Sequence, residues 1–64
     1  MHIVQVNEYY YVKIHDNNEE IRLYQLYNLG DNLICESYNR DLFILKCNKY
    51  VKLNNNIQCL IASY

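Results

Sequence analysis

The chain has 64 residues, of which 52% are hydrophobic and 20% are charged, and its formal net charge is −1. This length predicts one small domain spanning residues 1–64 and excludes a two-domain enzyme. The composition also excludes a collagen-like chain and a solvated polyelectrolyte tail. A single core of this size rarely supplies more than about 3–5 kcal/mol of stability, so a disulfide, a metal, a partner or a second copy of the chain would add to it.

Clusters of Asn and Asp divide the chain where Gly and Pro usually would, since the sequence has one Gly and no Pro. Asn and Asp favour turns because they tolerate left-handed backbone and hydrogen-bond their own backbone. The clusters lie at 15–18, 28–32, 39–41 and 54–56. Short segments separated by turn signals are typical of an antiparallel β-meander.

Alternating side chains predict strands at 9–15, 32–38, 42–47 and 57–64. Within 9–15, the even-numbered residues are expected to face the core and the odd-numbered residues to face away. The last two segments are apolar on both faces, so we expect them to be central in the sheet or covered.

The segment 19–28 supports two interpretations. As a strand, it places Ile21, Leu23 and Tyr27 on one face, which Gln25 interrupts. A bulge near residues 24–25 would repair the register and bring Leu26 inward. As a helix at about 18–28, it has capping residues, but its apolar side chains spread around the helix and form no stripe. We favour the strand.

The expected fold is therefore all-β, a single domain of about five antiparallel strands forming a meander or an SH3-like or OB-like barrel. The alternative is an α+β fold with the short helix at about 18–28. Residues 48–53 fit either one helical turn or a strand that continues past a bulge. Tyr10 and Tyr27 are the tyrosines expected in the core.

Three cysteines, Cys35, Cys47 and Cys59, follow one another at intervals of twelve residues. An odd number cannot pair completely within the chain, and the paired spacing of zinc sites is missing. A zinc site of three Cys with His2 or His15 is the alternative. We expect reduced cysteines that act as small buried hydrophobes, with no metal. Reduced thiols point to an intracellular protein.

Neither a signal peptide nor a membrane span is expected. Residues 1–8 contain no basic region followed by a long apolar run, and the longest apolar run, 42–45, is far shorter than a span. The predicted location is the cytoplasm, which is the host cytoplasm if the protein is viral.

Catalytic motifs are missing from the sequence. One Gly cannot build a phosphate-binding loop, and there is no metalloprotease, nucleophile-elbow or paired-carboxylate motif. A Cys–His dyad needs only spatial proximity and is the remaining enzymatic alternative. We expect a non-enzymatic protein with no catalytic residues and no cofactor.

Charge is distributed unevenly along the chain. Residues 1–41 hold all seven acidic and three basic residues, a net charge of −4, whereas the three lysines of 42–64 give +3. The basic part supports a nucleic-acid site, because lysines neutralise phosphates and a tyrosine can stack on a base. That candidate site comprises Lys46, Lys49, Tyr50 and Lys52.

A second candidate surface combines tyrosines with an acidic turn. Tyrosine offers a large, stiff contact area with a polar tip, and such residues are enriched in protein-binding hot spots. An acidic knob also suits docking on the basic surface of a nucleic-acid-handling complex. The candidate partner-binding residues are Tyr9, Tyr11, Lys13, Asp16, Glu19, Glu20 and Tyr24.

The leading hypothesis is a small intracellular protein that binds and blocks a protein partner. In size and composition the chain resembles the short proteins that phages and mobile elements use against host defence machinery, including anti-CRISPR-type inhibitors. The alternatives are an SH3-like or OB-like nucleic-acid-binding protein and a structural or assembly subunit, for which self-association, for instance as a homodimer, is the function.

Overall fold

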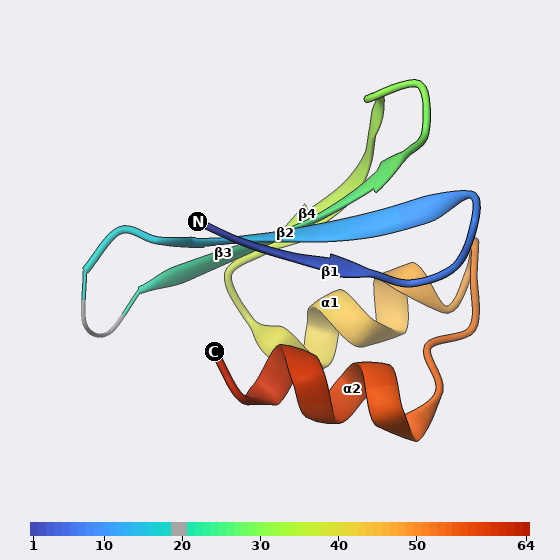
Figure 1. Cartoon of the computed structure of the whole chain (residues 1–64). Coiled ribbons are helices and arrows are strands. Elements are labelled where there is room, and N and C mark those ends of the chain that lie inside the picture. Colours follow the sequence, from blue (N-terminus) through green and yellow to red (C-terminus); the bar gives the residue numbers. More distant parts are fainter. Residues whose placement is uncertain (19–20) are drawn as a thin grey trace.

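The computed structural model describes residues 1–18 and 21–64, which form an antiparallel sheet and two helices lying on one side of it (Figure 1). The elements are β1 (His2–Gln5), β2 (Tyr10–Asp16), β3 (Arg22–Asn28), β4 (Leu33–Ser37), α1 (Arg40–Cys47) and α2 (Asn55–Ala62). The strands pair in sequence order, so the predicted antiparallel meander is confirmed for this part of the chain.

The alternation predicted for 9–15 is confirmed in β2. Val12 and Ile14 are fully buried, and Tyr10 packs against the same core. Val12 pairs with Val4 of β1, a strand that the alternation did not single out. Only one residue of β1, Val4, is buried, and this explains why the four-residue strand shows little apolar pattern.

The interpretation of 19–28 as a strand is confirmed by β3. Its buried residues are Tyr24 and Leu26, which pair with Ile14 and Val12 of β2 in a ladder without a register shift. Tyr27 therefore points to the opposite face, and the expectation that it joins the core was wrong. The expected bulge is also displaced, since the register shifts between Leu26 and Tyr27, where β3 pairs with β4.

The predicted strands at 42–47 and 57–64 are wrong, because these segments belong to α1 and α2. The described residues thus form four strands and two helices, a mostly β domain in place of the expected all-β fold of about five strands. The alternative α+β fold placed its helix at about 18–28, where β3 lies. The uncertain segment 48–53 is a turn and a loop that joins the two helices.

Both helices begin at an Asn that the sequence marks as a turn residue. Asn39 accepts a hydrogen bond from the backbone of Leu42, and Asn54 accepts one from Ile57, which satisfies backbone N–H groups at each helix start. The buried residues are four apart, Phe43 with Cys47 in α1 and Ile57 with Ile61 in α2. Residues four apart lie on one face of a helix and also on one face of a strand. The same apolar residues therefore fit a short strand and a short helix.

The core lies between the sheet and the two helices. α1 packs against β3 and β4, and α2 packs against β1. The buried hydrophobic residues are Val4, Val12, Ile14, Tyr24, Leu26, Phe43, Cys47, Leu53, Ile57 and Ile61. The helices thus cover one face of the sheet, and the other face is left for the side chains described below.

The cap of α2 gives a prediction about stability. Replacing Asn54 by Ala should lower the free energy of unfolding by about 1 kcal/mol, because the Ile57 N–H loses its acceptor. Chemical denaturation measures the change. Asn54→Asp keeps an acceptor and should stay near wild type, and Asn56→Ala, two positions inside the helix, is the matched control. Equal losses for Asn54→Ala and Asn56→Ala would contradict the capping role.

Candidate functional site

The face of the sheet turned away from the helices carries a connected group of polar and aromatic side chains. They come from residues that alternate with the core residues of β2, β3 and β4. We call this surface the open face, and its residues are Tyr11, Lys13, His15, Gln25, Tyr27 and Glu36. All are half-buried except Glu36, which is exposed, so a partner can reach their outer atoms.

Two stacked tyrosines form the centre of the open face. Tyr11 and Tyr27 are directly opposite each other across β2 and β3. Their ring centroids are 5.5 Å apart, and the angle between the ring planes is 10°. The Nζ of Lys13 lies 4.6 Å from the Tyr27 ring centroid and 5.9 Å from that of Tyr11. A cation at this distance is attracted to the ring faces, so Lys13 helps to hold both rings in place.

A chain of hydrogen bonds continues across the open face. Gln25 donates to Glu36 of β4 over 2.8 Å, and its Oε1 lies 2.7 Å from His15 Nε2. The same Oε1 accepts a hydrogen bond from the Tyr27 hydroxyl. Because Gln25 connects three strands in this way, the orientation of the Tyr27 ring is fixed by its neighbours.

The Tyr11 hydroxyl forms a hydrogen bond with a residue of the turn between β3 and β4. It donates to Asp31 Oδ1 over 2.5 Å, and this bond to a carboxylate raises the pKa of Tyr11 from 10.0 to about 12. Asp31 has a φ of 60°, a left-handed conformation that Asp adopts more readily than most residues. Asn28 supports the turn by accepting hydrogen bonds from the Gly30 and Asn32 N–H groups.

The partner-binding residues predicted from the sequence lie in different parts of the structure. Tyr11 and Lys13 lie together on the open face, whereas Tyr9 lies in the β1–β2 connection with 63% of its surface exposed. Tyr24 is buried in the core, on the side of β3 opposite the open face. Asp16, at the end of β2, forms ion pairs with Arg22 and His2 at 2.9 and 3.3 Å.

Two further predicted residues, Glu19 and Glu20, lie outside the described residues. The acidic turn of the prediction is therefore represented here by Asp16 alone. Since Asp16 is paired within the chain, the tyrosines and lysine of the open face are the stronger part of the predicted surface.

The candidate nucleic-acid residues lie in the helical layer. Lys46 is in the last turn of α1, where its Nζ donates to the Glu36 carbonyl oxygen over 3.1 Å. Lys49, Tyr50 and Lys52 follow in the connection to α2, and each is exposed. These four residues thus occupy one continuous stretch of chain, separated from the open face by the sheet.

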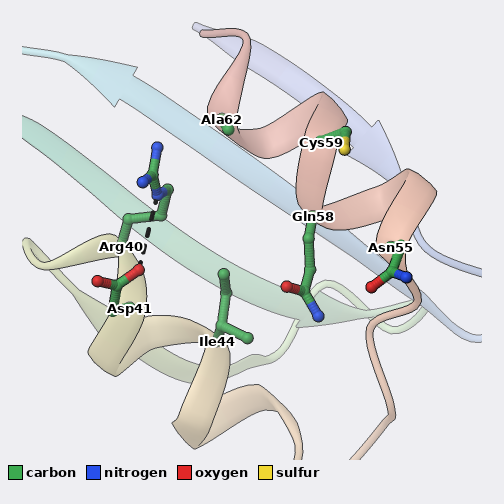
Figure 2. A pocket seen from close by; sticks show the side chains of 7 residues that line it. All are labelled: Arg40, Asp41, Ile44, Asn55, Gln58, Cys59 and Ala62. Carbon is green, nitrogen blue, oxygen red and sulfur yellow. Dashed lines mark ion pairs between the residues drawn. The ribbon is translucent and has the colours of Figure 1, made fainter.

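A groove of about 260 Å³ lies between the two helices. Figure 2 shows Ile44 of α1 and Gln58 of α2 on its two sides, with the Arg40–Asp41 pair at one end. Asn55, Cys59 and Ala62 complete its lining. The groove is open and of mixed polarity, and it lies on the side of the helices opposite the sheet.

No cluster of three His, Cys, Asp or Glu side chains that could hold a metal ion occurs within residues 1–18 and 21–64. Cys35, Cys47 and Cys59 are all free thiols. Among the helices of the described residues, none has the length and apolar character to span a membrane. No known protein family, curated protein or solved structure is significantly similar to this chain.

Sequence reasoning missed the part of the open face that β3 and β4 supply, namely Gln25, Tyr27 and Glu36. Alternation from Ile21 and Leu23 places Tyr27 on the core face, whereas the residues of β3 that are buried are Tyr24 and Leu26. Pairing the predicted strands would have found it, since aligning Val12 with Leu26 places Tyr27 opposite Tyr11.

Asp31→Asn tests the bond that raises the pKa of Tyr11. The neutral amide no longer opposes ionisation, so the pKa should fall from about 12 towards 10.0, measured by NMR titration of the ring. Since the folded-state pKa is the higher one, the stabilisation is present below pH 10 and is lost as the pH rises towards 12. Glu36→Gln is the control and should leave Tyr11 unchanged. An unaltered pKa in Asp31→Asn would refute the assignment.

Proposed function

We propose that this chain is a small binding protein that attaches to a protein partner through the open face of its sheet. The observation that carries the proposal is the half-buried Tyr11–Tyr27 stack on the helix-free side, which is fixed by Lys13, Gln25 and Asp31. Rings that are already held in place lose little conformational freedom on binding, so more of the contact energy becomes affinity.

The polar atoms of the open face bond mainly to one another. The Tyr11 hydroxyl, the Tyr27 hydroxyl and the Gln25 amide all have partners within the chain. What remains for a ligand is the apolar area of the rings and the outer atoms of Lys13 and Glu36. This arrangement suits surface contact better than covalent chemistry, and it supports a non-enzymatic role.

Charge favours a partner with a basic surface. In the sequence, residues 1–39 hold six acidic and two basic residues, and the four strands lie within this range. Residues 40–64, which contain both helices, hold four basic residues and one acidic residue. The sheet segment therefore has a net charge of −4 and the helical segment +3. Such a division steers the sheet towards cationic surfaces and suppresses approach by the helices.

A basic surface of this kind is typical of proteins that handle nucleic acid. By occupying it, the chain would compete with the nucleic acid and block the partner. This is the mode of action expected of an inhibitor of host defence machinery made by a phage or a mobile element, and we propose it as the biological role in the cytoplasm of the host.

Affinity purification with matched tyrosine variants tests the proposal. The bait is the wild-type chain in a nuclease-treated lysate of its own host, and each captured protein is purified and its affinity measured by calorimetry. Replacing Tyr11 and Tyr27 by Ala should weaken binding at least about 30-fold, the effect of losing one hot-spot residue. Circular dichroism establishes that the variant remains folded.

Tyr50→Ala is the control, because Tyr50 is an exposed tyrosine of the helical layer, 55% exposed. It should bind as wild type does. A loss of binding in Tyr50→Ala but not in the double variant would overturn the proposal, and so would salt-dependent binding of single-stranded DNA through Lys46, Lys49 and Lys52. Concentration-dependent dimers in sedimentation that the double variant abolishes would indicate self-association through the open face instead.

A further inference from the structure

Two of the three cysteines lie side by side at the boundary between the sheet and α1. The Sγ atoms of Cys35 in β4 and Cys47 at the end of α1 are 3.9 Å apart. Both are free thiols in this structure. At this separation the two sulfur atoms are in van der Waals contact, and closing the bond shortens their distance by about 1.9 Å to the S–S length of about 2.05 Å.

The fold brings these two thiols together through a short connection and a helix of two turns. The chain leaves β4 at Ser37, Asn39 caps α1, and the helix then packs back beneath β3 and β4. Lys46 fixes the returning end by donating to the Glu36 carbonyl oxygen. The twelve-residue interval between the two cysteines is therefore the length needed to return the chain to the middle of β4.

We propose that Cys35 and Cys47 are a redox-active pair that closes an intramolecular disulfide when the protein meets a low-molecular-weight disulfide such as oxidised glutathione. The Cys35 thiolate attacks one sulfur of the reagent, and the other sulfur leaves as a thiolate. Cys47 then loses its proton to solvent and attacks the Cys35 sulfur, which releases the second thiolate. The two protein thiols are oxidised, and the reagent is reduced to two thiols.

Burial determines the order of these steps. Cys35 is partly exposed, whereas Cys47 is fully buried, so an external reagent reaches Cys35 first. Burial raises the pKa of both thiols, and the positive charge of Lys46 partly opposes this at Cys35. Because the thiolate is the nucleophile, closure should be slow at neutral pH and faster as the pH rises.

The bond would fasten α1 to β4 where the half-buried Cys35 meets the buried Cys47. A disulfide that closes a loop of this length restricts the unfolded chain and so favours the folded state. In a reducing environment the pair stays open. Cys47 is then the small buried hydrophobe expected from the sequence, whereas Cys35 is half-buried and Cys59 is exposed, so that expectation was wrong for these two. In an oxidising environment the same pair becomes a covalent link.

The test uses Cys59→Ser, which removes the exposed cysteine of α2 and leaves the pair. After incubation with oxidised glutathione at mildly alkaline pH, mass spectrometry should show the loss of two hydrogen atoms from the monomer and no free thiol. The melting temperature should rise by about 5–15 °C and return to its starting value after reduction.

Cys35→Ser in the Cys59→Ser background is the control, and it should resist both oxidation and modification because Cys47 is buried. Three outcomes would overturn the proposal: a stable glutathione adduct at Cys35, disulfide-linked dimers, or two thiols that remain free after prolonged incubation of the folded protein. The measurement is independent of any partner, so its result is separate from that of the proposed binding function.

Discussion

Among the described residues, only one face of the sheet is covered by a second layer, and the rest of the structure follows from this constraint. Two helices of eight residues each close one face over a core built around Phe43, Leu26 and Ile14. The other face has no second layer among the described residues. Its large side chains must therefore pack against one another, as Tyr11, Tyr27 and Lys13 do. This packing buries no side-chain polar atom without a hydrogen-bond partner.

The strands could be predicted from the sequence where one face is buried and the other is not. In β2 the alternation of Val12 and Ile14 with Tyr11 and Lys13 is clear, because only one side meets the core. The helices could not be predicted in the same way. Leu45 fits a strand pattern with Phe43 and Cys47, yet it is 64% exposed on α1, because a helix brings residues four apart to the core and leaves the residue between them outside.

The candidate site was predicted only in part, for a related reason. Tyr11 and Lys13 were identified because β2 alone determines their side of the sheet. The positions of Tyr27 and Glu36 next to the residues of β2 depend on the register between the strands. The pattern within one strand does not determine that register, so the strands have to be paired first. Tyr24 shows the opposite error, since a tyrosine counted as surface fills the core against Phe43 with ring centroids 5.6 Å apart.

The division of the molecule into two layers also explains why the open face and the cysteine pair are independent. The open face is built by residues that point away from the core. The thiols of Cys35 and Cys47 meet on the other side of the sheet, which faces the core. Glu36 of β4 links the two, because its side chain bonds Gln25 and its carbonyl oxygen accepts a hydrogen bond from Lys46. Because successive residues of a strand point to opposite faces, one residue of β4 contributes to the surface while its neighbour completes the core. The proposed contact surface and the proposed redox-active pair can in this way share one strand without either one occupying the place of the other.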